Sequence, residues 1–263
     1  MARVARKVKD KRVLKLIRAY LEAGVMADGV CVRSEEGTPQ GGPISPLLAN
    51  ILLDDLDKEL EGRGHMFCRY ADDCNIYVRS RRSGERVKES VTRYLTERLK
   101  LQVNEAKSAV APATSRKVLG YSLWWARGRE VKVRVAPKAL EVFRDRVREL
   151  TNRNRGANLR TVVEELAVYL RGWKQYFHLA ETPRIFGELD GWIRRRLRML
   201  RLKQWKRGTT ACPAVMAAGV AESAAKHLAG RLRRWWWASN HPAIEQLLSL
   251  DHFDAMGLPR LAR

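Results

Sequence analysis

The residues best suited to chemistry are two adjacent carboxylates, Asp72 and Asp73, in the segment from His65 to Arg79, HMFCRYADDCNIYVR. Apolar and polar side chains alternate on both sides of the pair, which predicts two antiparallel strands joined by a turn that carries both acids. Neighbouring carboxylates repel each other unless a cation lies between them. Mg²⁺ binds hard oxygen ligands, often one or two carboxylates together with substrate phosphates. The pair is therefore a candidate magnesium site, although an isolated Asp-Asp pair is more often a solvated turn.

Each strand of this predicted hairpin has an apolar set with a period of two, so each has a face suited to a packed core. The first set is Met66, Cys68 and Tyr70, and the second is Cys74, Ile76 and Val78. The two acids lie between the sets. We therefore expect a hairpin that is anchored in a core and carries its carboxylates at the tip.

A loop rich in glycine and proline lies upstream of the hairpin, in the segment from Glu36 to Asn50, EGTPQGGPISPLLAN. Gly41 and Gly42 allow backbone to come close to a ligand, while Pro39 and Pro43 stiffen the approach. This loop is followed by an apolar helix. The carboxylate pair and the loop are thus candidates for two sides of one binding site.

Hydrophobic spacing predicts helices mixed with strands in the first half of the chain. The expected helices run from Asp10 to Gly24, along Leu48 to Leu60, and from after Gly84 to Leu99, with residues 79–84 as a turn; the expected strands are 30–33, 103–110, 118–125 and 131–135. The second helix carries Asp54, Asp55 and Asp57, which we interpret as a solvated face and not a metal site. This mixture predicts an α+β fold with an antiparallel sheet and packed helices over residues 1–135.

From Ala136 onward the pattern is helical only, so we place a domain boundary between residues 135 and 136. Helices are expected from Leu140 to Leu150, from Leu159 to Trp173 and from Arg184 to Lys206. The last has one apolar stripe, with arginines and lysines over the rest of its surface. A second basic and aromatic cluster, Arg231 to Trp237, contains three consecutive tryptophans that cannot all face one core. An all-α domain is therefore expected over residues 136–263.

The charge of the chain points to a polyanionic partner. Among its 263 residues, 51 Lys and Arg oppose 29 Asp and Glu, which gives a net charge of +22. A membrane surface or a halo of solvated charge would also fit, but eight Trp and seven Tyr favour nucleic acid, because aromatic and guanidinium planes stack on bases. The four cysteines have no metal-binding spacing, and no segment resembles a signal peptide or membrane span. We expect a soluble cytoplasmic protein with no membrane partner.

A set of short motifs, taken in order, carries a family resemblance. The motifs are Pro39-Gln40-Gly41, Tyr70-Ala71-Asp72-Asp73, Asn104 with Lys107, and Leu119-Gly120-Tyr121. In this order they resemble the motifs of reverse transcriptases. The segment Trp173-Lys174-Gln175-Tyr176-Phe177 and the arginine-rich helix after it resemble the maturase domain of group II intron-encoded proteins. The resemblance covers most of the chain and implies part of a polymerase palm over 1–135, followed by a thumb and maturase domain over 136–263.

The resemblance also implies roles for individual residues. Asp72 and Asp73 would be the catalytic ligands of a two-metal Mg²⁺ site. The nucleotide site would be formed by Pro39, Gln40, Gly41, Ala71 and Lys107, and the primer grip by Leu119, Gly120 and Tyr121. The RNA-binding residues would be Trp173, Lys174, Tyr176, Arg194, Arg195, Arg198, Arg201, Lys203 and Lys206. The implied partners are group II intron RNA, an RNA template with its DNA primer, and dNTPs.

One expected part of the family pattern is missing. The family uses a third carboxylate on a strand that would precede the first helix here, and that strand and the fingers would lie upstream of Met1. Asp10 opens a helix and is a poor substitute. We therefore weigh two functions: an RNA-directed DNA polymerase and maturase, present as a fragment whose upstream half is a possible partner, or a non-enzymatic RNA-binding maturase-like protein. The tail has no Cys/His cluster, so no zinc-supported endonuclease domain is expected.

Overall fold

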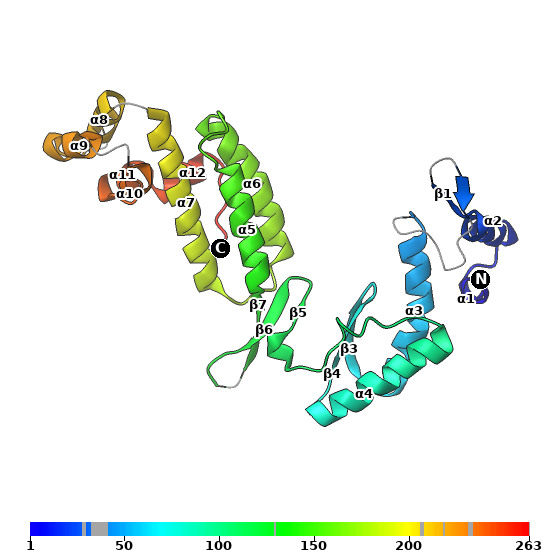
Figure 1. Ribbon diagram of the computed structural model, residues 1–263. Coiled ribbons are helices and arrows are strands. Elements are labelled where there is room, and N and C mark those ends of the chain that lie inside the picture. The colour runs from blue at the N-terminus through cyan, green and yellow to red at the C-terminus, as the bar shows by residue number, and fades with distance from the viewer. Residues whose placement is uncertain are drawn as a thin grey trace. The chain divides into compact units, whose positions relative to one another are not determined.

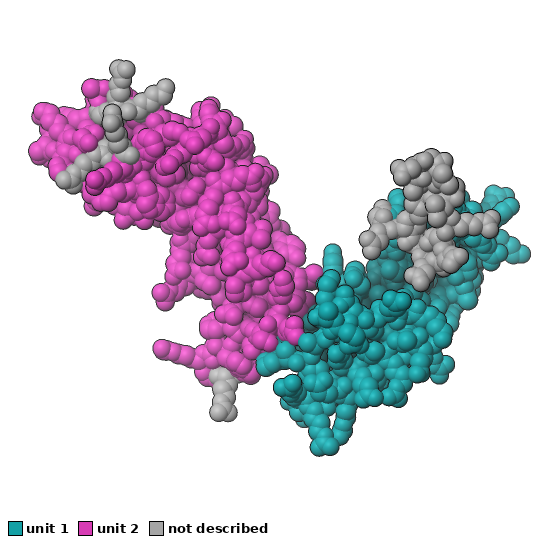
Figure 2. All heavy atoms as spheres, viewed as in Figure 1, with its two compact units in different colours: residues 1–113 teal, residues 114–263 magenta. Residues whose placement is uncertain are grey.

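The fold is known from a computed structural model, which describes residues 1–27, 30–32, 42–128, 130–205, 208–217, 219–230 and 234–262. The chain divides into two compact units, unit 1 (Met1–Ala113) and unit 2 (Thr114–Arg263) (Figure 2). The compact boundary therefore precedes the expected boundary at 135/136. The reason is that the strands after residue 116 pack on the helices of unit 2, where Ala136 N donates to Gly120 O at 2.8 Å.

In its described ranges, unit 1 combines helices with two small antiparallel sheets. Its described elements are α1 (Ala2–Lys7), α2 (Lys11–Glu22), β1 (Val25–Ala27), β2 (Val30–Val32), α3 (Ser45–Gly62), β3 (Met66–Tyr70), β4 (Asp73–Tyr77), α4 (Arg81–Tyr94), the π-helical turn η1 (Leu95–Leu99) and the start of the 3-10 turn η2 (Ala113–Ser115). Strand β1 pairs with β2, and β3 pairs with β4. The helices of unit 1 and the β3–β4 hairpin can be followed in Figure 1. The expected helix from Asp10 to Gly24 is confirmed, with the Asp10 side chain accepting from Arg12 N and Val13 N at its first turn.

Helix α4 begins earlier than the sequence suggested. Residues 79–84 were expected to form a turn, but Ser80 caps the helix by accepting from Ser83 N, and Gly84 lies inside its first turns. A Cβ at Gly84 would come within 2.6 Å of Val110 Cγ1. Gly84 thus does not end a loop. Its missing side chain allows Val110 to pack closely on α4.

The expected strand at 103–110 is absent from the described structure, where residues 105–107 form a turn. The Asn104 side chain accepts from Lys107 N at 3.1 Å, and Asn104 O accepts from Ser108 N at 3.0 Å. A side-chain oxygen that binds a backbone N–H three residues on competes with strand pairing. This local preference explains the incorrect prediction.

Unit 2 consists of a three-stranded antiparallel sheet followed by helices. Its described elements are β5 (Lys117–Val118), β6 (Tyr121–Trp125), β7 (Val131–Val135), α5 (Pro137–Leu150), α6 (Leu159–Tyr176), α7 (Pro183–Trp205), α8 (Gly208–Ala217), α9 (Glu222–Gly230), α10 (Trp235–Ala238), α11 (Pro242–Leu247) and α12 (Leu250–Ala255). The expected strand 118–125 is broken by a turn at Leu119 and Gly120, whose φ angles are 50° and 77°. The described residues thus form a mixture of helices and three separate small antiparallel sheets.

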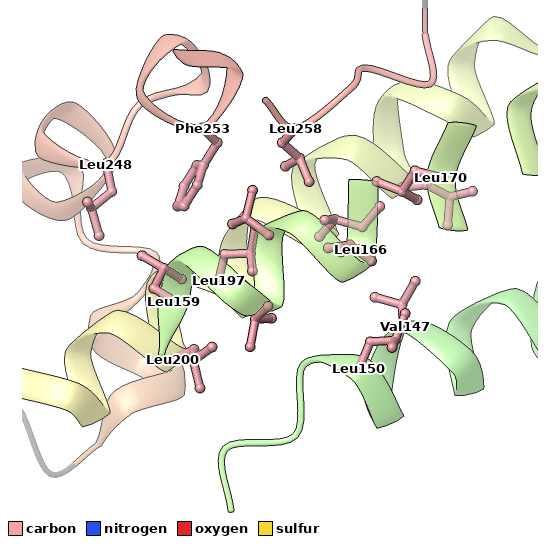
Figure 3. Packing of buried hydrophobic residues seen from close by; sticks show 14 of the residues in the cluster. Val147, Leu150, Leu159, Leu166, Leu170, Leu197, Leu200, Leu248, Phe253 and Leu258 are labelled. Atoms are coloured by element: carbon pink, nitrogen blue, oxygen red, sulfur yellow. The ribbon is translucent and has the colours of Figure 1, made fainter. Parts of the chain in front are cut away.

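The core of unit 2 is formed mainly by α5, α6 and α7 (Figure 3). The apolar positions with helical spacing are buried there, as predicted: Leu140, Phe143, Val147 and Leu150 on α5, Leu159, Val162, Val163, Leu166 and Leu170 on α6, and Leu189, Ile193, Leu197 and Leu200 on α7. Phe253 and Leu258, from α12 and the turn after it, also contribute to this cluster. The periodicity of the sequence therefore identified most of this core correctly.

The C-terminal segment is held against α7 by a buried carboxylate. The Asp190 side chain accepts hydrogen bonds from Leu261 N at 2.9 Å and Ala262 N at 3.0 Å. Arg194, one turn later, also contacts Asp190 Oδ1 at 3.2 Å. A buried charge needs such partners, because desolvation is otherwise costly.

Candidate metal-binding hairpin and basic helical surface

The predicted hairpin is confirmed. Strands β3 and β4 are antiparallel, and Tyr70 pairs with Asp73 in the last register position, so that Ala71 and Asp72 form the turn. Ala71 has a φ of 52°, a left-handed conformation that is uncommon for a residue with a Cβ. Asp72, in the turn, and Asp73, at the start of β4, are both exposed. The carboxylates are therefore presented at the tip, as the sequence indicated.

The face of β3 that packs against the small core of unit 1 is the opposite of the one predicted. Met66 and Tyr70 are 75% and 63% exposed, and Cys68 is exposed as well. In the antiparallel register, Phe67 lies opposite Ile76, and these two residues pack on the cluster of Leu56, Leu60 and Leu99. The alternation of residue types predicted that Met66, Cys68 and Tyr70 face the core. Cross-strand pairing instead places Phe67 on the same face as Ile76, which is the buried face of β4. The other face of the hairpin is open.

Asp72 and Asp73 differ from the other aspartates in their surroundings. Within the described ranges, neither side chain accepts a hydrogen bond or forms an ion pair. Every other aspartate there has such a partner: Asp10, Asp54, Asp55, Asp57, Asp145, Asp190, Asp251 and Asp254. The hairpin tip therefore presents two neighbouring, exposed acceptor groups that no other described residue binds.

The acids of α3 have partners of their own. Asp57 receives two hydrogen bonds from Arg69, and Asp55 receives one from Arg3 at 2.6 Å. The hydrogen bond from Arg3 lowers the pKa of the Asp55 carboxyl below its usual value. The expectation of a solvated acidic face thus fits Asp54, whose partner Lys58 is exposed, but is wrong for the other two acids. These acids bind arginines that belong to the fold.

Arg69 connects α3 to the turn of the hairpin. Its Nε and Nη2 atoms donate to the two carboxylate oxygens of Asp57 at 2.7 and 2.5 Å. Its Nη1 donates to Asn50 Oδ1 at 2.9 Å and to Ala71 O at 2.8 Å. This role of Arg69 leaves no signal in the sequence, because nothing in the pattern pairs position 69 with position 57.

The remaining predicted nucleotide-site residues have different outcomes. Lys107 is exposed on the turn held by Asn104. Pro39, Gln40 and Gly41 lie outside the described residues, and so their expected place beside the carboxylates stays a prediction.

The predicted primer-grip segment packs on the C-terminal end of α6, within unit 2. Tyr121 Oη donates to Tyr176 O, and Tyr176 Oη donates to Leu119 O at 3.1 Å. A Cβ at Gly120 would lie 3.2 Å from the ring of Phe177. Two motifs far apart in the sequence thus form one contact, which fixes the exposed turn at Leu119.

Some predicted RNA-binding side chains are buried and serve the fold instead. Arg194 is 0% exposed and binds Asp190 and Asp254, while Arg198 binds Glu245 at 2.5 Å. Trp173 is buried in the core. Lys174 donates to Arg260 O at 2.8 Å. Three expectations of RNA contact, those for Trp173, Arg194 and Arg198, are therefore corrected. Trp173 packs on aromatic rings of the core, and the two arginines are paired with carboxylates, as buried charges require.

Other cations of α7 are half-buried and stack on tryptophans. The guanidinium of Arg195 lies 4.0 Å from the ring centroid of Trp236, and Arg201 lies 5.7 Å from that of Trp205. Lys203 lies 5.9 Å from the ring of Trp235 and also donates to Arg153 O. Lys206 lies outside the described residues.

The three consecutive tryptophans are shared between core and surface, as expected. Trp235 packs on the core of unit 2, whereas Trp236 and Trp237 are 41% and 47% exposed. We call Arg195, Arg201, Lys203 and Trp236 the Arg–Trp surface. Guanidinium planes paired with exposed indoles suit base stacking.

Burial and ion pairing shift pKa values in both units. Burial raises the pKa of the Cys74 thiol, under the hairpin, to about 11. Burial also acts to raise the pKa of Asp254, but hydrogen bonds from Arg260 and Arg194 outweigh it, and the pKa is lowered. The Cys74 thiol is thus kept protonated, and the Asp254 carboxyl is kept ionised.

The described residues contain no cluster of three or more His, Cys, Asp or Glu side chains placed to hold a metal ion. The donor set at the tip consists of two carboxylates, which fits a hard cation whose remaining positions are filled by water and phosphate oxygens. In the same part of the chain, no helix is both long enough and apolar enough to cross a membrane.

Comparison with known families matches two regions of the chain. Residues 3–123 match the family "Reverse transcriptase (RNA-dependent DNA polymerase)", and residues 140–212 match "Group II intron, maturase-specific domain". The first region contains the hairpin and the Leu119 turn. The second contains most of α5, α6 and α7. The stretch between the two matches, residues 124–139, contains the point where the sequence pattern changes from mixed to helical.

Individual relatives agree with these two matches. The chain is 28% identical over 170 residues to Protein YkfC of Escherichia coli, covering 51% of the chain and 45% of the relative. It is 48% identical over 52 residues to the group II intron-encoded protein LtrA of Lactococcus lactis, covering 20% and 9%. It is 29% identical over 113 residues to the retron Ec86 reverse transcriptase of Escherichia coli, covering 40% and 35%. The chain thus spans less than half the length of these relatives.

Proposed function

Because the chain belongs to the group II intron-encoded reverse transcriptase/maturase family, we propose that it contributes the carboxylate hairpin of an RNA-directed DNA polymerase and the RNA-binding helices of an intron maturase. Its substrates would be dNTPs and a DNA primer on an RNA template. The observation that carries this proposal is the pair of exposed carboxylates at the tip of the β3–β4 hairpin, which have no partner among the described residues and lie inside the region that matches reverse transcriptases.

In this proposal Asp72 and Asp73 hold Mg²⁺. Bound there, the metal would neutralise phosphate charge and orient the attacking and leaving oxygens of nucleotidyl transfer. The chain's own residues position the reactants: the hairpin presents the two acids, and the exposed Lys107 and the loop with Pro39, Gln40 and Gly41 would hold the nucleotide. Residues 119–121 would hold the primer end. In this assignment residues 1–135 form part of a palm, and 136–263 form the thumb and maturase domain.

Primer extension tests the proposal. The full chain would be given an RNA template, a DNA primer, dNTPs and Mg²⁺, alone and together with a polypeptide that supplies the upstream half of the relatives. We expect DNA synthesis in at least one condition, and its loss in Asp72→Asn. Synthesis that persists undiminished in Asp72→Asn would contradict the role of the carboxylates.

A second function, RNA binding without polymerisation, is supported by the net charge of +22 and by the Arg–Trp surface. In this case the helical domain would bind group II intron RNA and assist its folding or splicing. Affinity should fall with salt, with a log–log slope of roughly 0.7–0.9 per phosphate contact.

RNA binding by wild type and Asp72→Asn separates the two functions. If binding alone is the function, Asp72→Asn should bind and promote splicing like wild type, and no primer extension should appear with either half of the protein present. Affinity that does not change with salt concentration would contradict RNA binding through the basic surface.

A further inference from the structure

We propose that Arg69 is a positioning residue for the metal-binding turn: its guanidinium holds the Ala71–Asp72 peptide in the conformation that presents both carboxylates. This inference rests on the proposed function, since it assigns a task to a residue that supports the same site. Arg69 itself faces α3 and not the open face of the hairpin, so its effect would act through the turn.

The guanidinium of Arg69 donates four hydrogen bonds, which reach helix α3 and the turn of the hairpin. Nε and Nη2 form a bidentate pair with Asp57 of α3, at 2.7 and 2.5 Å. Nη1 donates to Asn50 Oδ1 at 2.9 Å, also on α3, and to Ala71 O at 2.8 Å. The side chain is only 12% exposed. The fork is therefore fixed by a helix on one side and by the turn on the other.

The contact with Ala71 matters because this residue has an unfavourable backbone conformation. A left-handed φ costs a residue with a Cβ about 1–2 kcal/mol, and Ala71 has a φ of 52°. The carbonyl that Arg69 binds belongs to the peptide that leads directly into Asp72. A hydrogen bond from a charged donor to this oxygen stabilises the strained conformation and fixes the direction of the next residue.

A simple ion pair between α3 and β3 would not require this geometry. The pair with Asp57 uses two donors in a planar fork, which leaves Nη1 directed at the turn. A lysine would keep the charge but could not offer the same fork and a separate donor to Ala71 O. Arg69→Lys therefore retains a cation beside Asp57 while it disrupts the link to the turn.

The test compares Arg69→Lys with Arg3→Lys in the full chain. Arg3 is a matched control, because it also binds an acid of α3, Asp55, at 2.6 Å, but its contact does not reach the hairpin. Two readouts are independent of polymerase activity: hydrogen exchange of the amides in the peptide 66–77, and Mn²⁺ affinity measured by water-proton relaxation. Thermal unfolding reports on general destabilisation.

In Arg69→Lys we expect the amides of Asp72 and Asp73 to exchange faster than in wild type. We also expect Mn²⁺ binding to weaken by about 10-fold, the lower end of the effect of changing a residue that orients a metal ligand. Arg3→Lys should leave amide exchange and Mn²⁺ affinity unchanged, and the melting temperatures of the two variants should be similar. Asn50→Ser removes one acceptor of Nη1 and should shift both readouts in the same direction by less. If Arg69→Lys does not fold, the Asn50→Ser variant tests the positioning role in its place.

Equal exchange and equal Mn²⁺ affinity in Arg69→Lys and Arg3→Lys would overturn the positioning role and leave Arg69 as a structural ion pair. If wild type binds Mn²⁺ no better than Asp72→Asn does, the metal site of the proposed function fails instead. In that case the exchange of the turn amides still decides whether Arg69 holds the turn. The two failures are therefore distinguishable.

Discussion

The hairpin of unit 1 and helix α7 of unit 2 both carry runs of charge, yet the two regions place their charges in opposite ways. The hairpin exposes Asp72 and Asp73 with no partner among the described residues, while its supporting charge, Arg69, is turned inward and paired. Helix α7 buries Arg194 and Arg198 in ion pairs and leaves Arg195 half-buried, with its guanidinium over the ring of Trp236. Unpaired charge thus marks a candidate for chemistry, and paired charge marks the scaffold.

The difference follows from desolvation. A charge that is removed from water needs an opposite charge and hydrogen bonds in the interior, and it is then unavailable to a ligand. The paired residues of α7 hold α11, α12 and the C-terminal segment in place. The exposed carboxylates at the hairpin tip would exchange hydration for a cation at little cost to the fold, if they bind one as proposed. Four predictions, in order of expected effect, test this contrast.

The largest effect should come from the hairpin. Asp72→Asn should reduce primer extension by about 10³-fold, because the metal contributes several kcal/mol of charge stabilisation in the transition state. The melting temperature should stay within a degree or two, since the side chain has no partner in the described part of the fold. The matched control is Asp54→Asn, which removes an exposed pair with Lys58. Equal activity of the two variants would contradict the assignment.

The opposite pattern is expected for the buried arginine of α7. Arg194→Leu should lower the free energy of unfolding by about 3–5 kcal/mol, because it leaves Asp190 and Asp254 without their shared cation. Urea denaturation measures the loss. Arg195→Leu, at the neighbouring half-buried position, should cost clearly less, because among the described residues Arg195 donates to Trp236 O and stacks on its ring but neutralises no carboxylate. Similar stabilities for the two variants would show that burial does not separate their roles.

The Arg–Trp surface should affect RNA affinity without affecting stability. Trp236→Ala is expected to weaken RNA binding by about 1–3 kcal/mol, the usual range for one stacked base. Trp125→Ala provides a control of the same chemistry, because Trp125 is also exposed, at 60%, on β6. Filter binding at fixed salt measures both. A larger loss in Trp125→Ala would move the RNA interface to the sheet.

The smallest effect should be a pH dependence of unit 2. The folded state lowers the pKa of Asp254 below the ordinary value of 3.8, so its ion pairs contribute full stability above that value. The contribution should disappear as the pH falls from about 4 through the lowered pKa. Urea midpoints of wild type and Asp254→Asn between pH 2.5 and 6 should therefore converge in acid. A constant difference between them would contradict the shift.

The sequence predicted the parts of the fold that depend on local pattern. The apolar positions of α5, α6 and α7 were identified because helical periodicity and burial coincide there. The hairpin was identified from its alternation and its Asp-Asp turn. The expected strand at 103–110 was wrong because one side chain, Asn104, forms a turn with the backbone.

The sequence could not predict features that depend on pairing between distant residues. The buried face of β3 contains Phe67, because the register with Ile76 decides it, and not the more regular Met66 set. The link from Arg69 to Asp57 spans twelve positions and leaves no periodic signal. The burial of Arg194 depends on Asp254, which comes from a separate short helix.

The most direct test of the metal site is cleavage of the polypeptide by Fe²⁺ bound in place of Mg²⁺. With primer, RNA template and dNTP present, Fe²⁺ and peroxide should cut the chain close to residues 70–74, and mass spectrometry would locate the cuts. We predict that these cuts disappear in Asp72→Asn and Asp73→Asn but persist in Asp54→Asn. Cuts that remain in both hairpin variants, or that fall only elsewhere in the chain, would contradict the central claim that this hairpin binds the catalytic cation.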